Sequence, residues 1–181
     1  MQETEQQLLD AIHDGDREAL RRLYDRYSDY AMAIGLRYVY NREDARDVVQ
    51  DCFVKILTSI SSFEYRGEGS LKAWIATIVV NRSVDWVKLH ERIQVMGNVP
   101  DVADEEPPDI ERVPPDILIK MIGRLPAGYR LVLNLHVFER LTHSEIAHRL
   151  GIKESSSASR LSRAKLQLKE MINDFLNSQE R

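Results

Sequence analysis

The sequence has few features of membrane-embedded or secreted proteins. It contains one cysteine, Cys52, which excludes an internal disulfide framework and fits a reducing compartment. It has no run of about 18 apolar residues, which excludes a membrane-spanning helix. The first residues, MQETEQQLLD, have neither the basic start nor the apolar core of a secretory signal. We therefore expect the protein to be cytoplasmic.

Signs of catalysis are equally scarce. The five histidines show no metal-ligand spacing, since His143 and His148 stand five residues apart and on different sides of a helix. No glycine-rich loop that could cradle a phosphate occurs. The serines at 155–157 have no evident base, because His143 lies before a turn rather than beside them. Cys52 lies on an apolar helical stripe, where we expect it to be buried. We expect no enzymatic activity, no metal and no cofactor.

Charge is distributed unevenly along the chain. The net charge is −4, and with 43% hydrophobic and 30% charged residues the chain can bury a core. Residues 1–95 carry 13 basic and 16 acidic groups, residues 96–116 carry one and seven, and residues 117–181 carry 11 and six. A basic C-terminal segment thus follows an acidic tether, which is typical of a module that binds a polyanion.

The periodicity predicts an all-helical fold. Apolar residues recur at three- and four-residue steps from about residue 4, a second helix begins after the capping residue Asn41, and a third begins near Ser70. The stretch SSFEYRGEGS before Ser70 carries two glycines and is expected to be a loop.

Residues 96–116 are expected to be an extended linker. They contain five of the six prolines, which interrupt helices, and seven acids. After them we expect three or four short helices over 117–177. The predicted organisation is therefore two small helical domains, 1–95 and 117–181, joined by this acidic, proline-rich linker.

A helix-turn-helix is predicted near the C-terminus. Thr142 and Glu145 form a capping box, and Gly151 supplies a turn. In the helix that follows, one stripe is expected to pack inward: Ser157, Leu161, Ala164, Leu168 and Met171. A separate polar side is expected to face outward: Ser156, Ser159, Arg160 and Arg163. Small hydroxylated residues and arginines on such a face suit a DNA groove, although a helical hairpin with a solvated basic face has the same periodicity.

This C-terminal segment resembles region 4 of the ECF (extracytoplasmic-function) group of bacterial RNA polymerase sigma factors. The resemblance rests on a leucine-proline step, an arginine, an EIA helix, a glycine turn and an S-R-L-x-R-A-[RK] ending. These are Leu125, Pro126, Arg130, Glu145, Ile146, Ala147, Gly151, Ser159, Arg160, Leu161, Arg163, Ala164 and Lys165. It implies that the helix around 155–165 binds the −35 promoter element, with Ser155, Ser156, Ser159, Arg160, Arg163 and Lys165 as its contacts.

An independent segment upstream, REDARDVVQDCFVKIL, resembles sigma region 2.2. Its polar residues Asp47, Gln50 and Asp51 fall at three- and four-residue steps and share one face of a helix. The resemblance implies that this face binds a coiled coil of the polymerase β′ subunit. Taken alone, it is also the pattern of a solvated acidic face.

The stretch FEYRGEGSLKAWIATIVVNRSVDWVK resembles sigma regions 2.3 and 2.4, which hold a base flipped out of the −10 promoter element. The matching residues are Tyr65, Arg66, Gly67, Glu68, Asn81 and Arg82. Extruding a base costs a few kcal/mol of stacking, which an aromatic and an amide in such a loop can offset. Trp74 also matches, but a tryptophan on an apolar stripe is expected to pack, and Asn81 either caps locally or faces a ligand.

The resemblance covers about residues 5–95 and 117–172 and implies a sigma factor that directs promoter-specific initiation. It implies core RNA polymerase, promoter DNA and an anti-sigma factor as partners, and a monomer when free. The chain departs from the family pattern at Ser156, Ser157 and Ala158, where the family often has threonine, valine and a basic residue. The alternatives are a dimeric helix-turn-helix regulator of palindromic sites and an adaptor or anti-sigma decoy that does not bind DNA.

Overall fold

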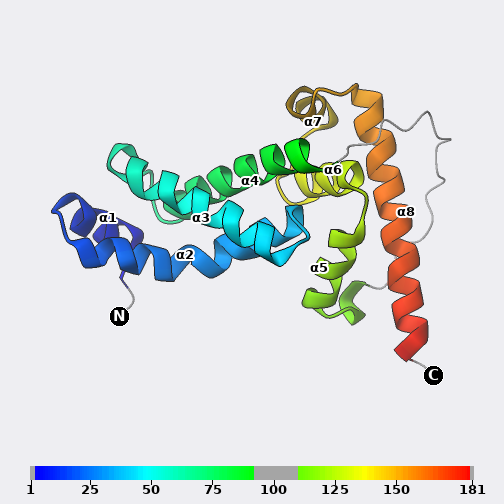
Figure 1. The fold of residues 1–181 in the computed structure, drawn as a ribbon, viewed down its shortest axis with the longest axis horizontal. Helices are drawn as coiled ribbons and strands as arrows, with labels where there is room; N and C mark the ends of the chain where they lie inside the picture. The colour runs from blue at the N-terminus through cyan, green and yellow to red at the C-terminus, as the bar shows by residue number, and fades with distance from the viewer. Residues whose placement is uncertain (1–2, 92–109, 180–181) are drawn as a thin grey trace. The chain divides into compact units, whose positions relative to one another are not determined.

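The computed structural model describes residues 3–91 and 110–179, which divide into two compact units, Met1–Trp86 and Val87–Arg181 (Figure 1). Every regular element in the described residues is a helix, which confirms the all-helical fold. The predicted linker lies outside the described residues up to residue 109, and the domain boundaries at 95 and 117 stay predictions.

The first unit is built from α1 (Glu5–His13), α2 (Arg17–Tyr38), α3 (Arg42–Ser59), the short 3-10 turn η1 (Ile60–Ser62) and α4 (Ser70–His90), whose end reaches past the unit boundary. Asn41 caps α3 as predicted, since its side chain accepts the amides of Glu43 and Asp44. The continuous helix expected before Asn41 is wrong. Gly15 has a φ of +86°, and Asp16 starts a new helix by accepting the Glu18 amide at 2.9 Å.

The core of the first unit joins α2, α3 and α4. Val48, Phe53 and Ile56 of α3 are buried, as their spacing predicts. Cys52 is buried too, and its thiol donates to the Ile78 carbonyl at 3.9 Å. Where α2 passes α3, a Cβ on Gly35 would lie 3.1 Å from a Val49 methyl group, so a glycine permits the close approach of these helices.

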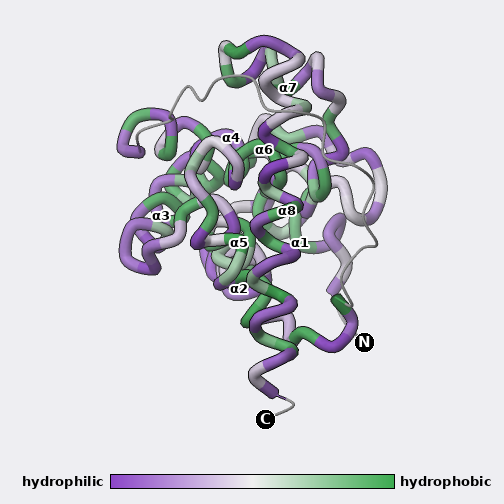
Figure 2. Tube along the Cα trace, turned by 90° about the vertical axis from the view of Figure 1, so that its right-hand side faces the viewer, coloured by the Kyte–Doolittle hydropathy of each residue, from purple (hydrophilic) through white to green (hydrophobic). Residues whose placement is uncertain are grey.

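The second unit contains η2 (Ile110–Arg112), α5 (Pro115–Arg124), α6 (Ala127–Val137), α7 (His143–Leu150) and α8 (Glu154–Gln179). Four helices agree with the expected number, but α8 is not short: it has 26 residues and packs against α5, α6 and α7 (Figure 1). Hydrophilic and hydrophobic residues alternate along the helices, as amphipathic packing requires (Figure 2). Val113, from the expected linker, is buried beside Met121 and Ile172.

The leucine-proline-arginine motif has a structural role at the turn between α5 and α6. Leu125 ends α5 in an extended conformation, and Pro126 precedes the first residue of α6. Arg130 is buried, and its guanidinium donates to the carbonyl oxygens of Gly123 and Leu125, each at 2.9 Å. Because the last carbonyls of a helix lack partners within the helix, one arginine satisfies the end of α5 and fixes the turn.

Candidate functional site

The polar face predicted on α3 is exposed. Asp47, Gln50 and Asp51 all lie open to solvent, opposite the buried side of the same helix. One turn further on, Val54 is 65% exposed. Single exposed aliphatic side chains are common on protein surfaces, so Val54 alone does not mark this face as a binding site.

Two residues that the sequence assigns to different partners contact each other. Asp51 accepts a hydrogen bond from the Arg82 guanidinium at 2.7 Å, between α3 and α4. This hydrogen bond raises the pKa of Arg82 above its ordinary value. Both side chains are about half exposed, so the pair is worth about 0.2–1 kcal/mol. The predicted polymerase face and the predicted −10 surface are thus joined by a weak ion pair.

The loop before α4 has a defined shape. Gly67 and Gly69 have φ values of +112° and +90°, which residues other than glycine rarely adopt. The Ser70 hydroxyl accepts the Arg66 amide at 3.2 Å, and the Tyr65 hydroxyl lies 3.5 Å from the Glu68 carboxylate. Arg66 and Glu68 are exposed and Tyr65 is half-buried, so the structure brings the predicted loop residues together on one surface.

The predicted residues on α4 divide into exposed and packed side chains. Asn81 and Arg82 are exposed. Trp74 is half-buried, and its ring centroid lies 5.0 Å from that of Phe63, which supports its packing role.

Sequence reasoning missed Glu5, which the structure brings to the base of this loop. The Glu5 carboxylate is buried against the first residues of α4 and accepts the backbone amides of Gly69, Leu71 and Lys72. These partners are 64–67 residues away in the chain. The local sequence TEQQ predicts only a helix start, so no sequence signal points to this contact.

The helix-turn-helix forms as predicted. Thr142 and Glu145 make a reciprocal capping box at the start of α7, and Gly151 ends α7 in the left-handed conformation with a φ of +67°. The bonds from Thr142 lower the pKa of Glu145. Leu161 and Ala164 are buried on the predicted inward stripe. Outside it, Ser155 and Lys165 are exposed, whereas these residues are half-buried: Ser156, Ser159 and Arg163.

The expectation that Arg160 lies on the outer polar face is wrong. Arg160 is only 7% exposed, and burial lowers its pKa below the ordinary value. The neighbouring Arg163 donates to the Tyr129 hydroxyl on α6 at 3.0 Å. The physical reason is that α8 packs against three helices, so more than one of its sides is covered.

The expected separation of His143 from the serines is also wrong. The turn folds α8 back on the start of α7, and the Ser157 hydroxyl lies 3.0 Å from Nδ1 of His143. The His143 ring also stacks on the His136 ring, with centroids 4.8 Å apart. Burial, and then the neighbouring His136, lower the pKa of His143. Because Ser157 is fully buried, a substrate could not reach this hydroxyl, and the contact is part of the packing.

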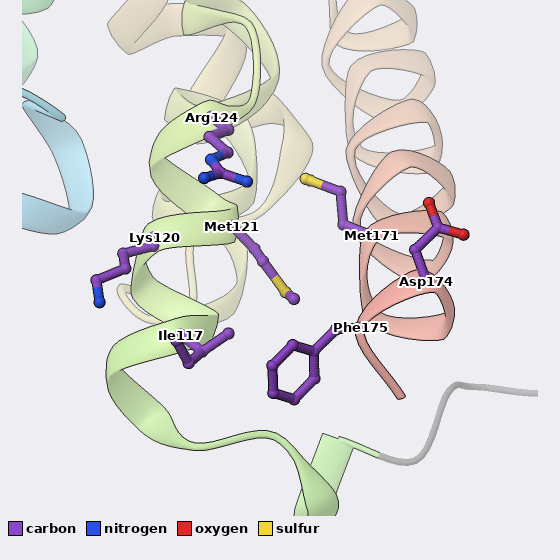
Figure 3. A pocket seen from close by; sticks show the side chains of 7 residues that line it. All are labelled: Ile117, Lys120, Met121, Arg124, Met171, Asp174 and Phe175. Atoms are coloured by element: carbon purple, nitrogen blue, oxygen red, sulfur yellow. The ribbon is translucent and has the colours of Figure 1, made fainter. Parts of the chain in front are cut away.

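The described residues contain no metal-ligand cluster, and their groove between α5 and α8 is lined mostly by apolar side chains. No group of three or more His, Cys, Asp or Glu side chains there could hold a metal. A groove of about 430 Å³ lies between α5 and α8, where Ile117 and Met121 face Met171 and Phe175 (Figure 3). Lys120, Arg124 and Asp174 complete its lining, which contains no histidine, cysteine or serine. Over the same residues, no helix is long and apolar enough to cross a membrane.

Comparison with known families matches both units. The family described as Sigma-70 region 2 matches residues 23–93, which include the α3 face and the loop, and the family described as Sigma-70, region 4 matches residues 116–168, which include the helix-turn-helix. The chain belongs to the ECF group of bacterial sigma factors. This sigma factor acts with RNA polymerase and directs promoter-specific initiation of transcription.

Relatives match over almost the whole sigma factor. It is 27% identical to the ECF RNA polymerase sigma-E factor of Haemophilus influenzae, over 96% of this chain and 97% of the relative. It is 29% identical to the RNA polymerase sigma factor YlaC of Bacillus subtilis, over 85% of this chain and 92% of the relative. A solved structure of CnrH in complex with the cytosolic domain of CnrY is 22% identical, covers 92% of this chain and 96% of that one, and has a TM-score of 0.45.

Proposed function

We propose that the sigma factor divides its work among three surfaces, of which the first is the α3 face. Asp47, Gln50 and Asp51 bind core polymerase through the β′ coiled coil. The observation that supports this most strongly is the exposure of all three on one face, within the region 2 match. Val54, 65% exposed among them, adds an apolar contact that the partner can cover.

The second surface captures the −10 element after the strands separate. Its residues are Tyr65, Arg66, Gly67, Glu68, Asn81 and Arg82. Tyr65 supplies an aromatic face on which a base can stack, and Asn81 supplies an amide that can read its edge. Arg66 and Arg82 supply positive charge for the phosphates. Support comes from the exposure of both arginines and of Asn81 and from the glycine-dependent loop that carries Tyr65.

The third surface is the start of α8, which enters the major groove of the −35 element. Ser155, Ser156, Ser159, Arg163 and Lys165 are its proposed contacts, and all are at least partly exposed. Arg160 contributes differently, as a buried residue that helps to hold α8 in place. Short serine side chains let the backbone approach the DNA closely, while Lys165 binds phosphate.

The remaining assignments follow from the family. Residues 96–116 carry seven acids, and we propose that this negative linker lies along the positive interior of the polymerase. Because such a linker repels DNA, polymerase binding precedes specific promoter binding. The free protein is a cytoplasmic monomer without enzymatic activity, and an anti-sigma factor clasps its two units.

The test separates the −10 surface from the other two. Tyr65→Ala and Asn81→Ala holoenzymes are compared with wild type on a promoter that carries 2-aminopurine in its −10 element. We expect the fluorescence rise on opening to slow by about tenfold or more, because stacking is worth about 1–3 kcal/mol per base. Affinity for core polymerase and for −35 duplex should stay unchanged. Opening at the wild-type rate in both variants would contradict the assignment.

A further inference from the structure

The N-termini of α1 and α4 cap each other through two glutamates. Glu5, the first residue of α1, sends its carboxylate to the start of α4. In return, Oε2 of Glu68, in the loop before α4, accepts the Glu5 backbone amide at 3.3 Å. Each glutamate thus satisfies amide groups at the beginning of the other helix, where partners within the helix are missing. Glu68 also lies 3.5 Å from the Arg26 guanidinium.

The Glu5 carboxylate accepts four hydrogen bonds, two on each oxygen. Oε2 accepts the amides of Gly69 and Leu71 at 2.8 and 3.1 Å. Oε1 accepts the Lys72 amide at 3.1 Å and the Tyr27 hydroxyl at 2.8 Å. The one remaining amide of this turn, that of Ser70, donates to the Gly67 carbonyl at 3.1 Å. Every backbone amide of Gly69, Ser70, Leu71 and Lys72 at the start of α4 therefore has a hydrogen-bond acceptor. Three of these four amides donate to the Glu5 side chain of α1.

Glu5 is held as an anion. Its side chain is 2% exposed, and burial alone would raise its pKa. The hydrogen bonds from Tyr27, Leu71, Lys72 and Gly69 outweigh burial, so the pKa lies below the ordinary value. A negative charge at this position is also favoured by the positive N-terminal end of the α4 dipole.

We propose that Glu5 is a positioning residue that holds the loop 65–69 in the shape needed to capture the −10 element. The inference depends on the proposed −10 role of that loop. Glu5 itself is buried and acts through Gly69 and the first turn of α4, so it does not touch DNA. Glu5 fixes the end of the loop at Gly69, and Glu68 fixes the loop to α1. Tyr65 and Arg66 are therefore ordered before the promoter binds, which lowers the entropic cost of capturing the −10 element.

The arrangement makes glutamine a poor substitute. Every group that faces the carboxylate is a donor, and each oxygen receives two of them. In Glu5→Gln the amide nitrogen is itself a donor and must face two others, so two hydrogen bonds are lost in a buried site. Tyr27→Phe removes only the hydroxyl donor and keeps the three backbone bonds, so its effect should be smaller.

The experiment measures loop order and promoter opening on the same variants. Hydrogen exchange on the full-length protein reports the amides of Gly69, Leu71 and Lys72, and 2-aminopurine fluorescence of the holoenzyme reports opening. For Glu5→Gln we expect exchange at these amides to accelerate, and opening to slow, by about tenfold or more each. Binding to core polymerase and to −35 duplex should stay within about twofold of wild type. Glu18→Gln, the same change at an exposed glutamate of α2, is the matched control and should behave as wild type.

Each other outcome has a distinct meaning. Unchanged exchange at the three amides, or faster exchange with wild-type opening, overturns the inference while Tyr65→Ala still tests the loop independently. If Tyr65→Ala and Asn81→Ala also open promoters normally, the proposed −10 role fails, and the inference fails with it. If exchange in Glu5→Gln accelerates throughout the protein, the variant is unfolded and Tyr27→Phe replaces it in the comparison. Faster exchange at the Lys72 amide of Tyr27→Phe, with promoter opening at the wild-type rate, would also contradict the inference.

Discussion

The two units of the sigma factor differ in how far the charged side chains of their binding motifs are buried. In the first unit the proposed contacts on α3 lie open to solvent, and the buried charge, Glu5, holds a loop from behind. In the second unit Arg160 of α8 is buried, and Arg163 donates to the Tyr129 hydroxyl. A charged residue in a binding motif can therefore serve either the partner or the fold, and its burial distinguishes the two roles.

The difference follows from how α3 and α8 are packed. The inner side of α3 carries the core residues Val48, Cys52 and Ile56, and Asp47 and Gln50 lie on the side away from them. By contrast α8 packs against α5, α6 and α7, so only part of its first turns stays free. Substitutions on the exposed face of α3 should therefore change binding without changing stability. On α8, substitution of a buried residue should lower stability as well.

The largest effect is expected from Asp47→Ala combined with Gln50→Ala. Hydrogen bonds that involve a charged group are worth about 1.5–3 kcal/mol and neutral ones about 1 kcal/mol, so affinity for core polymerase should fall by about 30-fold or more. The unfolding free energy should stay within about 0.5 kcal/mol, because both residues are exposed. Titration of labelled protein with core enzyme measures the first quantity, and urea unfolding measures the second.

Asp29→Ala is the matched control, since Asp29 is an exposed acid on α2 outside the α3 face. If Asp29→Ala weakens polymerase binding as much as the double variant, general charge rather than the α3 face controls association.

Arg160 and Lys165 form an internal comparison on one helix. Arg160→Ala should lower the unfolding free energy by about 2 kcal/mol, because it removes a buried side chain that α8 uses to pack. Lys165→Ala should leave stability within about 0.5 kcal/mol, because Lys165 is exposed. It should instead reduce the slope of log affinity for −35 DNA against log salt by about 1. If Arg160→Ala instead has wild-type stability and binds DNA more weakly, Arg160 is a DNA contact and not a packing residue.

Local signals in the sequence predicted much of this structure. Asn41, Thr142 with Glu145, and Gly151 act on residues within four positions, so their capping and turn roles could be read directly. The position of Glu5 could not, because its partners are brought close only by the fold. Periodicity places Arg160 outward because it assumes one buried side, whereas α8 has several neighbours. Apolar spacing continues across Gly15, so it gives no sign of the break between α1 and α2.

A smaller effect is expected from pH. The folded state holds the pKa of His143 below its unfolded value of about 6.5, so the unfolded chain binds the proton more readily. Stability should therefore decrease as pH falls through about 6.5 and level off below the folded pKa. The charged and titratable neighbours are His136, Glu154 and Lys165. Urea midpoints at pH 7.5 and 5.5 measure this loss of stability, which should be smaller in His143→Gln than in the wild type. An equal loss in both proteins would show that another group causes the pH dependence.

The smallest effect is expected from Arg82→Ala. Arg82 binds the Asp51 carboxylate, which is a proposed polymerase contact. Removal of Arg82 should therefore strengthen core binding by up to about fivefold, the equivalent of an exposed ion pair. The same variant should weaken capture of −10 single strand. Arg66→Ala, which leaves Asp51 paired, is the control, and weaker core binding by Arg82→Ala would show that the ion pair assists the polymerase contact.

Run-off transcription by core polymerase with and without the purified protein, on promoters selected from a random library, is the most direct test. We predict discrete start sites that appear only with the protein, and transcript yield that falls by about tenfold or more when either the −35 or the −10 element is scrambled. Start sites that are identical without the protein, or transcription indifferent to both elements, would contradict the account.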